Sequence, residues 1–319
     1  MFNLAINKGQ IVDPYSNTNN VLNLGINNGQ ISYIGKKELT AKKVIDASGL
    51  IVSPGFIDIH VHEDSIIFSD DPDTPLPLQT SKALLKTGIT TMVGGNCGIS
   101  PYPVDSYLER INKKNLSINY LMLVGYNTLR EMVGVNKYIE ASKEDIEIIK
   151  EMIKKGLNQG ALGVSFGLQY APGITKKEIK EIAKIVKQKS KFIAVHLRYD
   201  YPEKAMDALN EIIMIARETG VKFEISHIAA NIYGKENMDK ALDLLDKYNR
   251  KGYKIKADTY PYNVWATSIK STVFDPPYFK KLKFSLEDVE ILTGKYSGKR
   301  CDNDLFQELR NSKDDTLVA

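Results

Sequence analysis

Hydrophobic and polar residues alternate over short distances in the first fifty residues of the chain. Asn and Gly residues interrupt this alternation, first at Asn7-Lys8-Gly9 and again at Asn27-Asn28-Gly29, which separates the apolar runs 22–26 and 31–34. Asn-Gly between two such runs is typical of a hairpin, because both turn residues then have positive φ. We therefore expect residues 1–53 to form the N-terminal part of a small antiparallel β domain, with a turn at each Asn/Gly site.

After Pro54 the pattern changes to short β-rich runs that alternate with longer amphipathic segments. Helices are expected over 146–157, 178–188 and 202–218, and the first two follow the capping residues Ser142 and Thr175. Strands are expected at 56–61, 89–94, 119–124, 161–166, 192–197, 221–228 and 253–259. Alternating strands and helices imply a parallel sheet, and seven strands in series favour a (β/α)8-type barrel.

The last sixty residues do not continue this rhythm. The stretch 261–283 is irregular, and helical patterns follow around 285–292 and 305–311. Residues 316–319 are too short to supply an eighth barrel strand. We therefore expect residues 54–319 to form an incomplete barrel with about seven of eight strands, truncated before strand eight and before any C-terminal part of the small β domain.

Composition narrows the class of protein. Of the 319 residues, 43% are hydrophobic, which is enough for a substantial core, and the net charge of +4 is spread over helical segments. A nucleic-acid partner is therefore not expected. The chain shows neither a signal-peptide pattern nor an apolar span, so we expect no membrane association. Two cysteines, Cys97 and Cys301, cannot build a disulfide framework, which favours a reducing cytoplasm.

All four histidines of the chain lie at or just past the ends of expected strands: His60, His62, His196 and His227. In a barrel these ends converge at one mouth, where catalytic groups gather. Strand parity places His60 and His62 on one face with Asp58, and it likewise places His196 with Ala194 and His227 with Ile225. We take each of these faces as the barrel interior. A single buried histidine is more often a hydrogen-bonded core residue, but four of four at strand ends favour a metal site.

Cys97 belongs to the same group of candidate ligands. It follows the second expected barrel strand within Gly94-Gly95-Asn96-Cys97-Gly98, where glycines permit a sharp turn. On its own such a cysteine would be read as a small buried hydrophobe. A thiolate beside converging imidazoles suits zinc, whereas Cys301 stands in a hydrophilic run and is expected to be an exposed thiol.

Several motifs together resemble the amidohydrolase superfamily and, within it, the N-acyl-D-amino-acid deacylase branch. The resemblance rests on motifs that occur in family order: Pro54-Gly55-Phe56-Ile57-Asp58 with His60-Val61-His62, Gly88-Ile89-Thr90-Thr91, Gly94-Gly95-Asn96-Cys97-Gly98, Gly160-Ala161-Leu162-Gly163-Val164-Ser165-Phe166-Gly167-Leu168 with Tyr170, His196-Leu197-Arg198, Ser226-His227-Ile228 and Asp258-Thr259-Tyr260-Pro261-Tyr262. The similarity spans essentially the whole chain.

The resemblance implies zinc-dependent hydrolysis of N-acyl-D-amino acids. It implies one tightly held zinc on Cys97, His196 and His227, and a weaker adjacent metal position at His60 and His62. The family's general base is an aspartate on strand eight, and this sequence has no match for it, so we identify no catalytic base. Asp258 and Asp64 do not stand where the family pattern requires the base.

Two other residues are candidates for contact with the substrate. Arg198 could grip a substrate carboxylate through a bidentate pair, with a surface arginine as the alternative. Tyr170 could donate a hydrogen bond to the oxyanion, with apolar packing as the alternative. Several D-aminoacylases carry a lysine two residues after the histidine that matches His227, whereas Ala229 stands here. The Ser-His-Ile form resembles the D-glutamate deacylase-like members more closely.

Two alternative interpretations remain. Cyclic amidases of the dihydropyrimidinase or dihydroorotase kind also begin with His-x-His, but they bridge two metals with a lysine on strand four, and 161–168 contains none. The other alternative is a truncated, inactive metal-binding polypeptide. Its open barrel edges would favour self-association, and without the general base it would have negligible activity.

Overall fold

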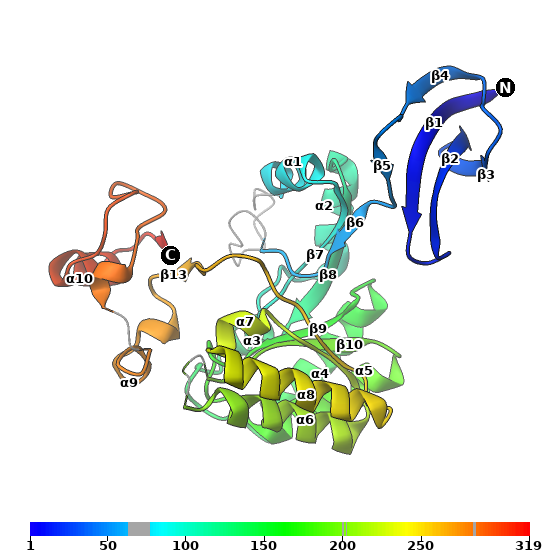
Figure 1. The fold of residues 1–319 in the computed structure, drawn as a ribbon. Helices are drawn as coiled ribbons and strands as arrows, with labels where there is room; N and C mark the ends of the chain where they lie inside the picture. The colour runs from blue at the N-terminus through cyan, green and yellow to red at the C-terminus, as the bar shows by residue number, and fades with distance from the viewer. Residues whose placement is uncertain (63–76, 200, 202, 283–284) are drawn as a thin grey trace. The chain divides into compact units, whose positions relative to one another are not determined.

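The computed structural model describes residues 1–62, 77–199, 201, 203–282 and 285–319. The chain divides into two compact units, Met1–Phe56 and Ile57–Ala319, and each is described by itself (Figure 1). No helix among the described residues is long and apolar enough to cross a bilayer.

The first unit is a five-stranded sheet in the order β3-β2-β1-β4, with β5 also paired to β1. β4 and β5 pair with β1 in parallel, so the wholly antiparallel unit expected from the sequence is wrong. Its strands are β1 (Phe2–Asp13), β2 (Thr18–Asn27), β3 (Gln30–Gly35), β4 (Ala41–Asp46) and β5 (Ile51–Val52). The hairpin at Asn28 and Gly29 is confirmed, with φ of 50° and 75°. The turn expected at Asn7-Lys8-Gly9 is wrong, because β1 runs through it and absorbs Lys8 as an irregularity against β2.

The second unit contains a seven-stranded sheet in the order β12-β11-β10-β9-β8-β7-β6. Its strands are β6 (Phe56–Asp58), β7 (Ile89–Gly94), β8 (Asn119–Gly125), β9 (Gly163–Gly167), β10 (Phe192–His196), β11 (Lys222–Ile225) and β12 (Ile255–Ala257). Adjacent strands from β7 to β12 pair in parallel. The expected α/β fold with seven strands of a (β/α)8-type barrel is therefore confirmed.

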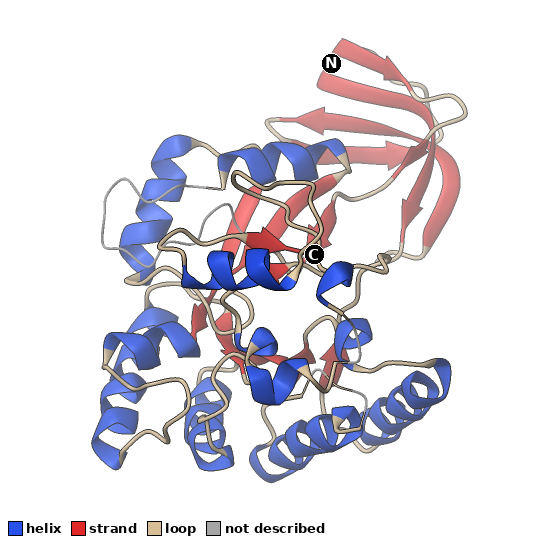
Figure 2. Cartoon of the chain, turned by 90° about the vertical axis from the view of Figure 1, so that its left-hand side faces the viewer, coloured by secondary structure: helices blue, strands red, loops and turns tan. Residues whose placement is uncertain are grey.

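Helices connect these strands and cover their outer side, as Figure 2 shows in blue against the red strands. Ser142 and Thr175 form capping boxes at the starts of α4 and α5, as expected from the sequence. The helices are α1 (Leu78–Lys86), α2 (Val104–Lys114), α3 (Tyr126–Met132), α4 (Lys143–Asn158), α5 (Lys176–Gln188), α6 (Ala205–Thr219), α7 (Ile228–Asn231) and α8 (Lys235–Arg250). Pro202, at which a helix was expected to begin, lies outside the described residues, and α6 begins at Ala205.

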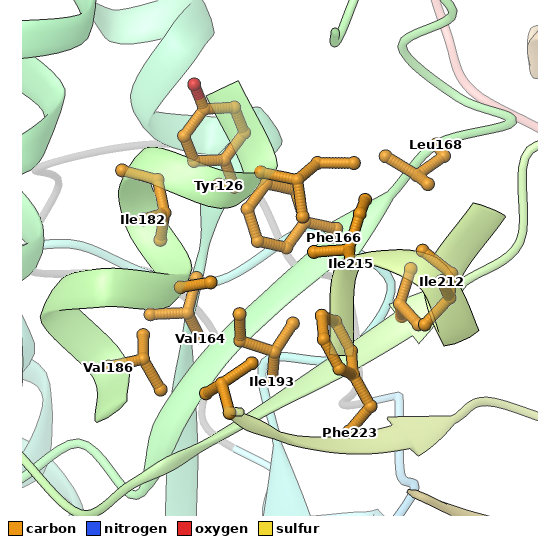
Figure 3. Close-up of a cluster of buried hydrophobic side chains, with 14 of the residues drawn as sticks. Tyr126, Val164, Phe166, Leu168, Ile182, Val186, Ile193, Ile212, Ile215 and Phe223 are labelled. Carbon is orange, nitrogen blue, oxygen red and sulfur yellow. The ribbon is translucent and has the colours of Figure 1, made fainter. Parts of the chain in front are cut away.

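The main hydrophobic core lies between the strands and these helices. Figure 3 shows Phe166, Ile193 and Phe223 from three adjacent strands directed toward side chains of α5 and α6 such as Ile182 and Ile212. A smaller cluster of Val93, Leu123 and Ala194 with Leu162 and Phe192 lies on the other face of the strands. Alternate residues of a strand thus face the helices or the barrel interior, and this alternation decides which side chains reach the mouth.

The C-terminal segment forms a separate apolar cluster around Phe274, Ile291 and Phe306. Cys301 is buried in this cluster, so the exposed thiol expected from its hydrophilic neighbours is wrong. Its elements are β13 (Thr267–Ser268), η1 (Thr272–Phe274), α9 (Pro276–Phe279), η2 (Leu286–Asp288), α10 (Asn303–Asn311) and β14 (Leu317–Val318). The helix expected around 285–292 is wrong, because one short 3₁₀ turn is followed by antiparallel bridges at Glu290 and Ile291. Among the described residues no eighth strand joins the barrel sheet.

Candidate metal centre

The structure brings the five candidate ligands of the sequence analysis together at the carboxyl ends of the strands. His60 and His62 follow β6, Cys97 follows β7, His196 ends β10, and His227 follows β11. Their donor atoms fall into two groups that share Cys97: His60 and His62 form one group with it, and His196 and His227 form the other. Within each group the atoms lie within 4.8 Å of one another.

A strained loop aims the Cys97 thiol into this cluster. Cys97 has a left-handed backbone with φ of 53°, and Gly98 beside it has φ of 81°. Ser165 on β9 fastens the loop, since its hydroxyl donates to the Gly95 carbonyl at 2.5 Å and accepts from the Gly98 N–H at 3.0 Å. The Cys97 side chain is buried, and its Sγ lies 3.5 Å from His60 Nε2 and 3.4 Å from His227 Nε2.

His227 reaches the cluster by a different route from the one that strand parity predicts. Phe223 and Ile225 pack against the helices, so their face of β11 is the outer one, and placing His227 with them on an inward face was wrong. The strand ends at Ile225, and His227 then takes a left-handed conformation with φ of 36° and ψ of 53°. This backbone turn, and not the strand alternation, directs the imidazole inward. His196 by contrast shares the interior face with Ala194, as predicted.

Asp258, just past β12, contacts two of the histidines. Its Oδ2 lies 3.0 Å from Nδ1 of His60, and its Oδ1 accepts the backbone N–H of His227 at 2.5 Å. From the sequence, Asp258 is a candidate only for a substitute base. A polar residue at the end of the last strand was the available signal for this second role. Asp64, the other carboxylate considered there, lies outside the described residues.

The imidazoles crowd one another closely. Ring centroids are 5.0 Å apart between His60 and His227, and 4.5 Å apart between His196 and His227. Burial and then the neighbouring imidazoles, His196 first, hold the pKa of His227 well below its usual value. His227 therefore stays neutral at physiological pH, with a nitrogen lone pair available for a cation.

This donor set fits a zinc ion by its chemistry and its spacing. One thiolate and several neutral imidazoles are the ligands that zinc prefers. Typical zinc bonds to sulfur and nitrogen at a tetrahedral angle separate the two donors by about 3.5 Å. The two Cys97 contacts, at 3.5 and 3.4 Å, agree with that separation.

Tyr170 and Arg198, the two expected substrate contacts, differ in their surroundings. The Tyr170 ring lies beside His196, with centroids 4.5 Å apart, and so borders the cluster. Arg198 forms a bidentate pair with Glu211 on α6, at 2.9 Å for both contacts, and also donates to the carbonyls of Pro172 and Ile174. Through these contacts the Arg198 guanidinium connects α6 with the loop that follows β9.

Glu224 is a further acidic residue of the interior that was not predicted from the sequence. It stands between the outward residues Phe223 and Ile225 and therefore faces inward. Its Oε1 is buried without a hydrogen-bond partner among the described residues. Burial, and next the charge of Asp258, raise the pKa of Glu224 to about 7. Its signal was a charged residue in the middle of an otherwise apolar strand.

Comparison with known proteins identifies the class. The sequence profile of the amidohydrolase family matches residues 51–213, just over half of the chain, and the protein belongs to this family. It is 29% identical over 297 residues to a D-aminoacylase from Alcaligenes xylosoxydans xylosoxydans, covering 84% of this chain and 59% of the relative. An N-acyl-D-glutamate deacylase from the same organism is also 29% identical, over 81% of this chain and 57% of the relative.

A solved structure supports the same fold. The N-acyl-D-glutamate deacylase of Bordetella bronchiseptica, in complex with zinc and a phosphonate inhibitor, superposes with a TM-score of 0.81 at 25% identity. The superposition covers 99% of this chain and 71% of that one. The chain thus spans less than two thirds of the length of the two sequence relatives named above.

Proposed function

We propose that this protein hydrolyses the amide bond of N-acyl-D-amino acids in a zinc-dependent reaction, releasing a carboxylate and a D-amino acid. The observation that carries the proposal is the convergence of Cys97, His196 and His227 at the strand ends of an amidohydrolase-family barrel. Relatives named as D-aminoacylase and N-acyl-D-glutamate deacylase supply the substrate class.

We assign the tightly bound zinc to Cys97, His196 and His227, and a weaker adjacent position to His60 and His62. Zinc at such a site supplies a hydroxide at neutral pH and polarises the amide carbonyl. The left-handed turns at Cys97 and His227 direct both side chains toward the other candidate ligands. Preorganised donors avoid rearrangement during the reaction.

Tyr170 is proposed as a hydrogen-bond donor to the oxyanion, because its ring borders His196. No general base is assigned. Among the described residues, Asp258 contacts the cluster through both its oxygens, and Asp58 accepts the backbone N–H of His60 at 3.1 Å. We therefore expect residues 1–319 on their own to show negligible deacylase activity, since general-base catalysis typically contributes about 10²- to 10⁴-fold.

The cyclic-amidase alternative is weaker on this structure. The lysine that would bridge two metals is expected on strand four of the barrel, and β9 contains only Gly163-Val164-Ser165-Phe166-Gly167. Cys97 instead lies within reach of both donor groups. A reducing compartment agrees with the free thiols of Cys97 and Cys301.

Elemental analysis tests the metal assignment. We expect zinc to copurify with the protein and Cys97→Ala to lower its occupancy more than His60→Ala does. Cys301→Ala is the matched control, because Cys301 is also a buried thiol but packs in the C-terminal cluster. Equal zinc content in the Cys97→Ala and His60→Ala variants would contradict the assignment.

The activity is tested by release of D-amino acids from N-acetyl-D-glutamate and N-acetyl-D-methionine. We expect a form extended by a strand with an additional carboxylate to hydrolyse one of them only when zinc is present. Robust zinc-dependent release by residues 1–319 alone would show that the base is among these residues. Hydrolysis of a cyclic amide such as a hydantoin, without any release from N-acyl-D-amino acids, would overturn the proposed substrate class.

A further inference from the structure

Asp258 joins two ligands that come from distant strands. His60 follows β6 at one end of the sheet order and His227 follows β11 near the other end, yet one carboxylate contacts both. Building on the zinc site of the proposed function, we propose that Asp258 is a positioning residue of the metal centre. It fixes which nitrogen of His60 carries the hydrogen, and it holds the backbone turn that directs His227 inward.

The effect on His60 follows from hydrogen-bond chemistry. A carboxylate oxygen only accepts hydrogen bonds, so the contact between Asp258 Oδ2 and His60 Nδ1, 3.0 Å long, places the ring hydrogen on Nδ1. The lone pair of the neutral ring is then on Nε2, which lies 3.5 Å from the Cys97 sulfur. Both side chains are well shielded, with 11% exposure for His60 and 13% for Asp258, so water competes weakly for this contact. Asp258 therefore presents the correct nitrogen to a metal ion.

The effect on His227 follows from the backbone. A left-handed conformation is costly for a residue with a side chain and persists only when its surroundings hold it. Asp258 Oδ1 accepts the His227 N–H at 2.5 Å, and the Asp258 carbonyl accepts the Ile228 N–H at 3.0 Å. The Asp258 N–H in turn donates to the Ile225 carbonyl at 3.0 Å. Three hydrogen bonds from one residue thus enclose the turn at His227.

These contacts argue against the two other roles open to a carboxylate at this place. Each Asp258 oxygen has a second lone pair, but metal ligation or proton uptake there would weaken the contact that it already makes with His60 or His227, and in the limit release it. Release of His60 would free the ring to rotate, and release of His227 would loosen the left-handed turn. Either change would cost a donor of the cluster.

Two substitutions separate the two contacts. In Asp258→Asn the amide oxygen can still accept the His227 N–H, which leaves the amide NH₂ facing His60 Nδ1. The amide donates there, so the His60 hydrogen moves to Nε2 and the ring can no longer ligate through that atom. Asp258→Ala removes both contacts. We expect Asp258→Asn to weaken only the His60/His62 position by about 10- to 100-fold, and Asp258→Ala to weaken both zinc positions.

Histidine NMR gives a direct readout, because the chain has only four histidines. Long-range ¹H–¹⁵N spectra of ¹⁵N-histidine-labelled protein report which ring nitrogen carries the hydrogen, and His60→Gln identifies the His60 signals. In the unsubstituted protein we expect the hydrogen on Nδ1 with or without zinc, and in Asp258→Asn on Nε2. Zinc affinity is measured in parallel by competition with a chromophoric chelator.

The matched control is Glu224→Gln, which removes a nearby interior carboxyl group whose buried Oε1 has no hydrogen-bond partner among the described residues. This variant should leave the His60 signals and both zinc affinities unchanged. A hydrogen on Nε2 of His60 in the unsubstituted protein would overturn the inference even if every variant failed to fold. So would unchanged zinc affinities in Asp258→Asn. Absence of zinc binding to the unsubstituted protein, with the hydrogen on Nδ1, would refute the proposed function and leave the placement by Asp258 supported.

Discussion

At the scale of single residues, two acidic side chains of the interior have opposite surroundings. Asp258 has a partner for each oxygen, whereas Glu224 has a buried oxygen without one among the described residues. The consequence for Glu224 is a pKa raised to about 7 by burial and by Asp258. A carboxyl group that prefers its neutral form links the stability of the fold to pH.

The sign of this linkage gives a prediction for Glu224→Gln. Between pH 4.5 and about 7 the folded state keeps a proton that the unfolded state releases, so stability falls as pH rises through this window. Glutamine stays neutral throughout. We expect the variant to match the unsubstituted protein near pH 4.5 and to exceed it by about 1–2 kcal/mol at pH 8, after allowing for partial exposure. Urea unfolding at several pH values measures this, and a difference independent of pH would contradict it.

Arg198 gives a second prediction at this scale. Its pair with Glu211 is nearly buried, with 12% and 7% exposure, so Arg198→Ala should lower the free energy of unfolding by about 3–5 kcal/mol. The double variant Arg198→Met/Glu211→Leu should recover much of that loss, because no uncompensated charge remains. Thermal unfolding of the single and double variants measures both effects. If Arg198 instead served the substrate, its loss would raise KM with little change in stability.

The candidate site shows what residue patterns can and cannot reveal. Spacing alone predicted that His60, His62, Cys97, His196 and His227 would converge, because strand ends of a parallel barrel meet at one mouth. The way His227 gets there could not be predicted, since a left-handed residue breaks the alternation that parity relies on. The contacts of Asp258 depend on two residues 31 and 198 positions away, which no local pattern encodes.

At the scale of elements, the loop after β7 is the most constrained part of the site. A Cβ on Gly98 would lie 2.1 Å from Asn127 Oδ1 and 2.6 Å from the Gly167 nitrogen. Asn127 cannot move aside freely, because its amide bonds both the carbonyl and the N–H of Gly167. The loop that presents Cys97 is therefore packed tightly between α3 and β9, and we call this tight packing at Gly98 the lock.

Gly98→Ala tests this lock, with Gly134→Ala as its control. Both glycines have nearly the same positive φ, 81° and 80°, but nothing lies within 4 Å of a Cβ built on Gly134. We expect Gly134→Ala to cost about 1–2 kcal/mol of stability through backbone strain alone. Gly98→Ala should cost more and should also lower zinc affinity, as chemical unfolding and chelator competition would show. Equal losses for the two variants, with zinc binding intact, would count against the lock.

The boundaries of helices and strands could be predicted where the local sequence signal is strong and no distant strand alters it. The strand at Ile89–Gly94 was expected at 89–94 because apolar residues flanked by turn signals leave little choice. The bulge at Lys8 and the bridges at Glu290 and Ile291 could not be predicted, because pairing with distant strands overrode the local signal. Local sequence thus located the elements that pack on one core, and missed those whose partners lie far along the chain.

At the scale of the whole second unit, the sheet ends in two short strands, β6 and β12, that have only one neighbour each among the described residues. Near the mouth, however, the contact between His60 and Asp258 links the residues that follow these two strands. The contact between His60 and Asp258 therefore connects the first and the last strand of the sheet near the mouth, and we call this connection the clasp. An ion that binds there should stabilise both ends together.

Hydrogen exchange tests the clasp. Amides of β6 and β12 should exchange faster than those of β8 to β10, because edge strands leave part of their backbone unpaired. Adding zinc should slow exchange at both edges and change β8 to β10 little. Mass spectrometry of peptic peptides measures this, and runs at two protein concentrations separate the effect from self-association through the edges. Protection of only one edge by zinc would contradict the clasp.

The left-handed turns at Cys97 and His227 have a consequence for how such a sequence changes over time. Glycine adopts a left-handed backbone without strain. At both positions it would therefore give a more stable fold in a protein that does not bind a metal. A lineage freed from catalysis would gain stability by drifting to glycine there, in line with the usual opposition between function and stability. The thiol and the imidazole at those two turns stand against the backbone preference, so folding alone does not explain their presence there.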